Sequence, residues 1–516
     1  MNKLLTAGAC TGTAVLLLAC TAENKSPNII FILADDMGYG DVSALNESSK
    51  IQTPNIDRLA RRGAVFTDAH SSSSVSTPTR YGILTGRYNW RSALKSGVLN
   101  GYSLPLIPQE RTTIASMLKS RDYETACIGK WHLGWRWNSV EAGSEQVDFS
   151  KPIADGPCAV GFGYFYGIPA SLDMPPYVYI ENDRPTAIPD RMTENAGAQS
   201  WWRKGLTAPD FNHRTTLSHL TDKAIAYIEE KAGNDNPFFL YLPLPAPHTP
   251  ILPSDDFRGK SGLNPYGDFV MEVDYTVGRI IEAVRKNGID RNTILVFTSD
   301  NGCSPEARLD ELQKKGHYPS YIYRGHKADL FEGGHRIPCI VQWPARIRPH
   351  TVRQTICLTD FLATFASIAG YKLNDSEGED SYNLLPLLEN ENENETSTTR
   401  EATIHHSING DFTIRQGDWK LLLSPGSGGW SYPRPDRDTV ALRSLPGIQL
   451  YNLKTNPAET QNVYADHPET VTRMTSLLIT CIENGRSTPG APQTGNDGPA
   501  DWKISLIMKL RQAGVL

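Results

Sequence analysis

The sequence predicts an α/β protein in which helices cover a large, mostly parallel central sheet. Three continuous apolar runs, at residues 28–33, 238–244 and 293–298, have the length and composition of strands buried on both faces. Segments with apolar residues at helical spacing lie between these runs. Strands that alternate with helices are typical of a parallel sheet sandwiched between helical layers.

Each element has recognisable limits. The first run is bounded by Pro27 and by an Ala-Asp-Asp sequence. The segment before Gly233 and residues 361–368 before Gly370 are predicted to be helices, because glycine commonly ends a helix. The apolar positions that define the first of these helices are Leu217, Leu220, Ala224, Ile225 and Ile228.

The C-terminal part differs in character from the rest of the chain. Residues 389–400 are polar and of low complexity, which indicates an exposed loop near a domain boundary. Beyond it, residues 412–423 and 449–453 predict a small antiparallel sheet, and residues 468–482 predict a helix. A chain of 516 residues suits one large domain and a smaller one. We therefore predict a first, large domain over 25–388 and a C-terminal subdomain over 401–516.

The composition limits the kinds of partner. Hydrophobic residues make up 39% of the chain, which supports a folded globular protein. The net charge is −6 and the pI is about 6.1, so the sequence gives no electrostatic reason to expect nucleic-acid binding.

The N-terminus resembles an export signal. Lys3 precedes an apolar run that is too short for a permanent membrane span and ends in Leu-Leu-Ala-Cys at Cys20. This ending resembles a bacterial lipobox, which implies a signal peptide over residues 1–20, a lipid on Cys20 and a periplasmic or cell-surface lipoprotein. The lipid would be the only membrane contact. The alternative is a plain signal peptide in which Cys20 is incidental.

The remaining cysteines leave the disulfide question open. There are eight cysteines, of which Cys10 would leave with the signal and Cys20 would carry lipid. An exported compartment permits disulfides, but six cysteines allow 15 pairings and their spacing selects none.

Oxygen-bearing side chains follow two of the predicted strands. Asp35 and Asp36 come after the first run, and Asp300 and Asn301 follow the third. Ligands gather at the carboxyl ends of strands in such sheets, so these side chains are expected to share one site. Hard cations such as calcium prefer these oxygens. Each pair read alone is also compatible with ordinary turn chemistry.

Residues 76–86, Ser-Thr-Pro-Thr-Arg-Tyr-Gly-Ile-Leu-Thr-Gly, resemble the signature of type I sulfatases. The resemblance implies an alkaline-phosphatase-like sandwich fold. It also implies that a radical maturase oxidises Ser76 to formylglycine, an aldehyde whose hydrate attacks sulfur, and that Arg80 anchors this group. The alternative is that Ser71 to Ser74, with Ser76 and Thr77, form a flexible polar loop.

The same family resemblance extends to other motifs. Ile-Leu-Ala-Asp-Asp-Met-Gly-Tyr-Gly-Asp and Thr-Ser-Asp-Asn-Gly resemble the family's calcium-binding segments. The implied calcium ligands are Asp35, Asp36, Asp300, Asn301 and the modified Ser76.

Three further motifs supply cations and histidines. Gly-Lys-Trp-His-Leu-Gly contains Lys130 and His132, Pro-His-Thr-Pro contains His248, and Gly-His-Lys-Ala-Asp contains Lys327. The resemblance implies that Lys130 holds the formylglycine hydrate with Arg80, and that His132 takes the proton that lets sulfate leave. His248 and Lys327 would bind sulfate, with His248 donating to the leaving oxygen. Each residue alone could instead be structural or solvated.

The segment 161–173 resembles the arylsulfatase A and N-acetylgalactosamine-6-sulfatase branch. We therefore expect a sulfated glycan substrate from a host or an alga, with sulfate on O6 or O4 of galactose or N-acetylgalactosamine. Aromatic residues gather in the sequence, and exposed ones could stack on sugars: Trp131, Trp135, Trp137, Tyr164, Phe165, Tyr166, Trp201 and Trp202.

Two alternatives remain open. One is a phosphomonoester or phosphonate hydrolase of the alkaline phosphatase superfamily, with Ser76 unmodified. The other is a non-catalytic glycan-binding lipoprotein. Glu332-Gly333-Gly334 is interpreted as structural, because paired glycines indicate a close backbone approach.

Overall fold

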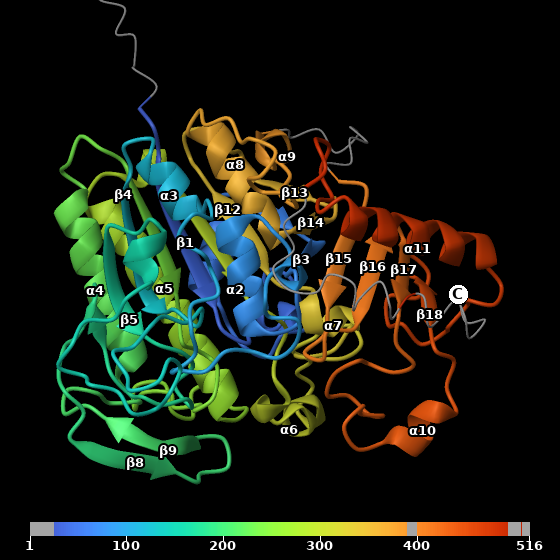
Figure 1. Ribbon diagram of the computed structural model, residues 1–516, viewed down its shortest axis with the longest axis horizontal. Helices are drawn as coiled ribbons and strands as arrows, with labels where there is room; N and C mark the ends of the chain where they lie inside the picture. Colours follow the sequence, from blue (N-terminus) through green and yellow to red (C-terminus); the bar gives the residue numbers. More distant parts are fainter. Residues whose placement is uncertain (1–24, 390–399, 494–506, 508–516) are drawn as a thin grey trace, which may run out of the picture.

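The computed structural model describes residues 25–389, 400–493 and 507. Its centre is a ten-stranded sheet in the order β13-β2-β12-β11-β1-β10-β4-β5-β6-β7 (Figure 1). The bounds of these strands are β1 (Asn28–Ala34), β2 (Ala64–Phe66), β4 (Glu124–Lys130), β5 (Tyr164–Ile168), β6 (Ile180–Glu181), β7 (Arg184–Pro185), β10 (Phe238–Pro243), β11 (Thr293–Ser299), β12 (Cys339–Gln342) and β13 (His350–Val352).

The middle of the sheet is parallel. β1 lies between β10 and β11, and β10, β4 and β5 continue in the same direction. Antiparallel pairing begins only at β12 on one side and at β6 on the other. Residues 29–34 of β1 are all buried, because helices cover both faces of the sheet. The three predicted strands are confirmed to within one residue at each end.

Two sets of helices cover the sheet (Figure 1). In one set α1 (Pro54–Ala60) and α4 (Thr216–Lys231) pack on α5 (Pro265–Lys286). In the other set α2 (Ser76–Thr85) and α3 (Ile114–Lys119) pack on α8 (Phe361–Ile368). The predicted helices correspond to α4 and α8. The shorter elements are α6 (Leu309–Lys314), α7 (Glu332–His335), α9 (Leu385–Glu389), β3 (Ala69–His70), β14 (Ile356–Cys357) and the β8 (Arg191–Asn195) and β9 (Trp202–Thr207) hairpin.

A second, antiparallel sheet lies in the C-terminal part. It consists of β15 (Thr403–His406), β16 (Phe412–Gln416), β17 (Trp419–Leu422) and β18 (Gln449–Asn452). One helix, α11 (Pro468–Glu483), packs on it, while the short α10 (Thr439–Arg443) lies before β18. This confirms the predicted small sheet and helix. Trp90, from the N-terminal part, joins the core beneath this sheet, so the two parts share packing.

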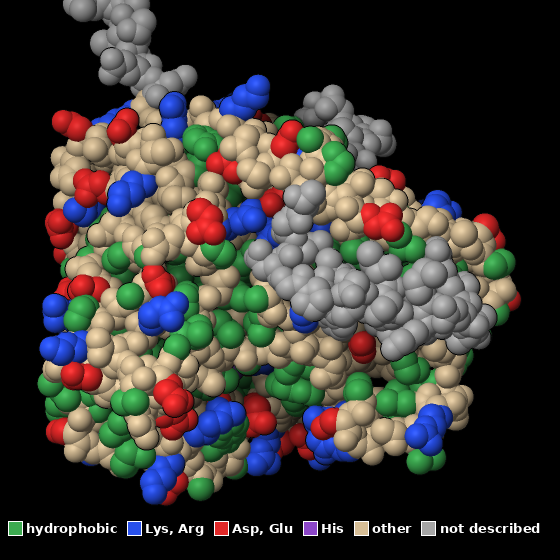
Figure 2. Space-filling model, in the orientation of Figure 1, with side chains coloured by type: hydrophobic (Ala, Val, Ile, Leu, Met, Phe, Trp, Pro, Cys, Tyr) green, Lys and Arg blue, Asp and Glu red, His purple; other side chains and the backbone are tan. Residues whose placement is uncertain are grey.

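Some predictions concern residues that the structure does not describe, and the structure answers the questions about cysteines and membrane spans. The signal segment 1–20, including Cys20, and most of the polar loop 389–400 are not described, and the domain boundaries stay predictions. The six cysteines that the structure describes after residue 24 are all free, so none pairs with another. Across residues 25–389 and 400–493, helices are too short or too polar to cross a membrane. Acidic and basic side chains are interspersed on the face shown in Figure 2.

Candidate active site

Four neighbouring parallel strands deliver polar side chains to one edge of the sheet. Asp35 and Asp36 follow β1, and Asp300 and Asn301 follow β11. All four are at most 1% exposed, although burying unpaired carboxylates is costly. Two other strands add a lysine and a histidine, because Lys130 ends β4 and His248 lies five residues beyond the end of β10. The sequence argument that placed Asp35, Asp36, Asp300 and Asn301 together is thus confirmed as geometry.

Helix α2 brings Ser76 into this group. Ser76 is its first residue, so its side chain lies at the positive end of the helix dipole. The Ser76 hydroxyl donates to Asp35 Oδ1 at 3.3 Å, and Lys130 Nζ donates to Ser76 Oγ at 3.4 Å. Arg80, one helical turn later, donates through Nη2 to Asp300 Oδ2 at 2.8 Å. The segment predicted to carry the nucleophile is therefore an ordered helix start, not a flexible loop.

Each of three carboxylates has its own cation. Lys130 Nζ lies 2.7 Å from Asp35 Oδ2, and Lys327 Nζ lies 2.8 Å from Asp36 Oδ2. Asp300 has the Arg80 guanidinium described above. Lys327 comes from the loop before α7, where its backbone N–H donates to Cys303 O at 2.9 Å. The result is a dense charged cluster in which removal of one partner would leave a buried charge uncompensated.

Electrostatics keeps the central carboxylate ionised. Burial alone would raise the pKa of Asp35, but the charges of Lys130, His248 and Arg80 hold it below its usual range. Burial lowers the pKa of Lys130, which Asp35 opposes. For Lys327, burial is outweighed by Asp36 and Asp35, so its pKa is raised.

The two histidines are oriented differently. His132 Nε2 donates to Leu99 O at 2.7 Å, which leaves Nδ1 as a buried acceptor without a partner among the described residues. Burial, followed by the charges of Lys130 and Arg80, holds the pKa of His132 well below its usual value, so its ring is neutral. His248 Nδ1 donates to Thr249 O at 2.6 Å, and its Nε2 lies 3.6 Å from Asp36 Oδ2.

The oxygens of this cluster suit a hard divalent cation. The donor set consists of carboxylate and amide oxygens without a thiolate, which is the ligand chemistry of calcium. Asn301 is fully buried beside Asp36, yet its Oδ1 finds no hydrogen-bond partner among the described residues. An orphaned buried oxygen next to three carboxylates is what a bound cation would satisfy. The residues present therefore fit the predicted metal.

A pocket of about 200 Å³ opens onto the cluster. Ser76, His132, His248 and Lys327 all line it, whereas the remaining predicted site residues lie beneath. Ser171 and Asp173 line it too, and Ser171 Oγ and Asp173 Oδ1 have no hydrogen-bond partner among the described residues. The apolar residues of the lining are Val75, Val98, Met174, Trp201, Ile408 and Trp430.

The predicted aromatic group is largely structural. Trp131, Trp135, Trp137, Phe165 and Tyr166 are at most 5% exposed and belong to the main core. Tyr164 and Trp202 are half-buried, and of the eight aromatics only Trp201 lines the pocket. The sequence could not separate the buried aromatic residues from the one that lines the pocket. They are the same residue types and lie close together in the chain, and neighbouring strand residues point to opposite faces.

Several pocket residues were not predicted, and Asp173 and Trp430 show why. Asp173 is the last residue of the segment that resembled the arylsulfatase A branch. The resemblance therefore included it, but no role was assigned to it. Its Oδ2 accepts a hydrogen bond from Arg203. Trp430 comes from the C-terminal part, more than a hundred residues from any predicted site residue. No local pattern identified it, because its position depends on how the two parts pack.

Comparison with known proteins identifies the family of this chain. The sulfatase family model matches residues 27–371. The chain is 33% identical to an N-acetylgalactosamine-6-O-sulfatase of Bacteroides thetaiotaomicron over 88% of this chain and 93% of that protein. It is 31% identical to human arylsulfatase A, over 88% and 87% respectively. A solved structure described under metabolism of multiple glycosaminoglycans by Bacteroides thetaiotaomicron superposes with a TM-score of 0.78, at 32% identity, covering 88% of this chain and 99% of that chain.

The matched region contains the whole charged cluster, and the family implies both formylglycine and a calcium site. The ten-stranded sheet with its small C-terminal sheet is the alkaline-phosphatase-like sulfatase fold. The chain belongs to the sulfatase family and is an enzyme that hydrolyses sulfate esters.

Proposed function

We propose that this sulfatase acts on a sulfate ester of galactose or N-acetylgalactosamine, at O6 or O4, in a host or algal glycan. The observation that carries this proposal is the pocket above the cluster. Asp173 Oδ1 and the Ser171 hydroxyl, which have no hydrogen-bond partner among the described residues, suit a substrate rich in hydroxyl groups, and the apolar lining residues suit a sugar face. The name of the Bacteroides relative supports the same class.

In this proposal Ser76 is the precursor of formylglycine, made by a radical maturase. The modified side chain supplies a hydrated aldehyde, which is a better nucleophile than an isolated serine hydroxyl. Lys130 Nζ and the buried Arg80 hold it, because Lys130 already contacts Ser76 Oγ at 3.4 Å. The start of α2 adds the positive end of a helix dipole.

His132 acts as the base. Its Nε2–H is committed to Leu99 O, so its neutral Nδ1 is free to accept a proton from the hydrate and allow sulfate to leave. A ring whose pKa lies well below its usual value is unprotonated at neutral pH, as this role requires. His132 and Ser76 line the same pocket.

His248 and Lys327 act on the substrate side. His248 Nε2 points toward Asp36, 3.6 Å away, and is assigned to donate a proton to the leaving sugar oxygen. Lys327 Nζ is assigned to a sulfate oxygen, where a cation stabilises the charge that develops in the transition state. Calcium, when bound by Asp35, Asp36, Asp300, Asn301 and the modified Ser76, would neutralise sulfate charge and polarise the nucleophile.

The proposed location is the periplasm or cell surface, with a lipid on Cys20 as the membrane attachment. The motivation is the lipobox-like ending at Cys20. Cys20→Ala should move the protein from the membrane fraction to the soluble fraction of the host cell. Retention of the variant in the membrane fraction would contradict the lipid anchor.

The substrate class is tested with the full chain co-produced with a radical maturase. A panel should contain galactose and N-acetylgalactosamine sulfated at O6 or O4, glucosamine 6-sulfate, and galactose 6-phosphate. We expect release of sulfate from at least one of the first group. Cleavage of the phosphate ester with every sulfated sugar untouched would favour the phosphatase alternative. Binding without release of sulfate by the matured protein would favour a glycan-binding lipoprotein.

The role of His248 has its own test. A sugar alkoxide leaves less readily than a phenolate, so it depends more on a proton donor. His248→Ala should therefore reduce kcat on the sulfated sugar far more than on an activated aryl sulfate. Equal losses on both substrates would show that His248 only binds.

A further inference from the structure

One loop beside the active site leaves large apolar side chains in solvent. Residues 318–324 expose Tyr318 by 50%, Tyr321 by 38% and Ile322 by 49%. Scattered exposed hydrophobic residues are normal, but a group of them marks a surface that binds something. The loop lines a groove of about 440 Å³, here called the tyrosine groove, formed by Tyr318, Tyr321, Ile322, Arg324, His326 and Ser431 with their neighbours.

The same chain segment that carries Asp35 and Asp36 fixes this loop. The Gly40 N–H donates to Pro319 O at 2.7 Å. A Cβ at Gly40 would lie 2.2 Å from Tyr318 O, so only glycine allows this approach. The backbone of the loop is therefore held in place while its apolar side chains remain exposed. A preorganised surface of this kind loses little conformational entropy on binding.

The tyrosine groove adjoins the catalytic pocket. Lys327 lines the pocket and its neighbour His326 lines the groove. Likewise Trp430 lines the pocket and Ser431 lines the groove. The partition between them is organised by Asp329, whose Oδ1 accepts from the Trp430 and Ser431 N–H groups at 2.8 and 3.0 Å. A bound glycan that extends out of the pocket across this partition would enter the groove.

The groove has the chemistry of a carbohydrate subsite. Tyrosine rings can stack on sugar faces and hydrogen-bond through their hydroxyls. Its lining includes Arg324 and His326 but none of the lining residues is acidic, which suits an anionic glycan. Figure 1 shows α6, which precedes the loop, beyond the carboxyl end of the sheet, where the β8–β9 hairpin also lies.

We propose that the tyrosine groove binds the sugar units next to the sulfated residue, so that the enzyme recognises an oligosaccharide and not only the sugar that loses sulfate. This rests on the proposed carbohydrate substrate. The C-terminal part contributes to this second binding site through Ser431, whose neighbour Trp430 lines the catalytic pocket.

The test compares two substrates of the matured full-length enzyme. One is the sulfated monosaccharide that the wild type cleaves, and the other is an oligosaccharide that carries the same sulfated residue. The ratio of kcat/KM for the oligosaccharide over that for the monosaccharide is measured for the wild type and for Tyr318→Ala/Ile322→Ala. We expect the double variant to lower this ratio about tenfold. Tyr275→Ala, an equally exposed tyrosine on α5, should leave the ratio unchanged.

Two results would overturn the proposal in different ways. A wild-type enzyme active on both sugars, with the same ratio in the double variant, would overturn the groove alone. A wild type inactive on every sulfated sugar would overturn the proposed substrate and the groove with it. Binding of the oligosaccharide to Ser76→Ala protein gives a second measurement, and adding Tyr318→Ala should weaken it about tenfold. Equal affinity would also contradict the groove.

Discussion

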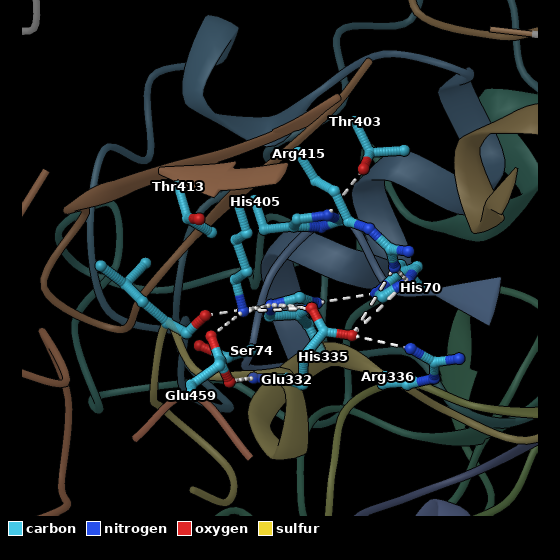
Figure 3. A network of polar contacts seen from close by, with 12 residues as sticks. His70, Ser74, Glu332, His335, Arg336, Thr403, His405, Thr413, Arg415 and Glu459 are labelled. Atoms are coloured by element: carbon cyan, nitrogen blue, oxygen red, sulfur yellow. Dashed lines mark hydrogen bonds and ion pairs between the residues drawn. The ribbon is translucent and has the colours of Figure 1, made fainter. Parts of the chain in front are cut away.

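Two of the buried clusters of charged side chains among the described residues differ in kind, and one of these two has the features of a reactive site. The first is the cluster at the carboxyl edge of the sheet, which faces a pocket. The second, called here the buried network, lies between α7 and the C-terminal sheet (Figure 3). Its members are Asp68, His70, Glu332, His335, Arg336, His405, Arg415, Lys420 and Glu459.

The buried network is held together by its own members. Lys420 Nζ lies 3.1 Å from Glu332 Oε1 and 2.8 Å from Glu459 Oε1, and all three side chains are fully buried. Arg415 Nη1 lies 2.6 Å from Asp68 Oδ1. The Arg415–Asp68 pair joins residues 347 positions apart, so the network connects the C-terminal sheet to the N-terminal part of the chain.

Its three histidines could be mistaken for a metal site. His335 Nε2 donates to Leu330 O at 3.0 Å, and His405 Nδ1 donates to Ser71 O at 2.8 Å. One nitrogen from each of His70, His335 and His405 lies within 4.8 Å of the others, but these rings contact one another: His335 and His405 stack with centroids 4.1 Å apart, and His70 Nδ1 lies 2.9 Å from His335 Nδ1. Glu332 Oε1 and Glu459 Oε1 each have Lys420 Nζ as an ion-pair partner, whereas in the catalytic cluster Asn301 Oδ1 and His132 Nδ1 have no partner among the described residues. Unpaired buried atoms beside a pocket, and not charge density, distinguish the site.

The largest expected effect separates chemistry from folding. Ser76→Ala removes the oxygen that is oxidised, so sulfate release should fall about 10⁴-fold or more while the melting temperature stays close to that of the wild type. Ser72→Ala, in the same segment, is the matched control and should remain active. Substantial activity in Ser76→Ala protein would refute the assignment of the nucleophile.

The second effect tests the unpaired amide oxygen. Asn301→Ala removes a proposed calcium ligand, so activity should fall about 10³-fold and the bound calcium per protein should decrease. Metal content by mass spectrometry and sulfate release are measured together. Full calcium content in an inactive variant would show that Asn301 does not bind the ion.

The third effect should appear in stability instead. Lys420→Met leaves Glu332 and Glu459 without their shared cation, so the free energy of unfolding should fall by about 3 kcal/mol. Activity per folded molecule should change little. Lys454→Met, an exposed lysine beside β18, is the control. If Lys420→Met abolishes activity while the melting temperature is unchanged, the distinction between the two clusters is wrong.

The smallest effect is a pH dependence. Burial raises the pKa of Glu459 to about 7, against the opposing charge of Lys420. The pKa of this carboxyl is 4.5 in the unfolded chain, so between pH 4.5 and about 7 the folded state binds more protons than the unfolded state. The contribution of Glu459 to the unfolding free energy is fully present below pH 4.5 and is lost as the pH rises through about 7. Relative to Glu459→Gln, the wild type should lose unfolding free energy from pH 5 to 7, as chemical denaturation would measure. Parallel curves would contradict this.

The sequence predicted the structure correctly where the relevant pattern lies within a short segment. Apolar runs located β1, β10 and β11, and the side chains after β1 and β11 followed from parallel topology. The paired glycines were correctly interpreted as structural, since a Cβ at Gly334 would lie 2.2 Å from Asp329 O. The roles of the site residues came from family resemblance.

Long-range packing could not be predicted in this way. Trp430 reaches the pocket because Asp329 holds its backbone, and the buried network joins His70 to Arg415 across 345 positions. Neither contact has a periodicity or spacing that a sequence would display. The aromatic cluster shows the opposite failure, because composition cannot separate core rings from exposed ones.

The central claim is that the enzyme works through an aldehyde formed at Ser76, and the mass of its peptide tests this most directly. Trypsin should release residues 63–80 of active protein co-produced with a maturase. Conversion of the Ser76 hydroxymethyl group to an aldehyde removes two hydrogens, so this peptide should be about 2 Da lighter, and the converted fraction should rise with specific activity. Fully active enzyme with an unmodified residue 76 would contradict the account.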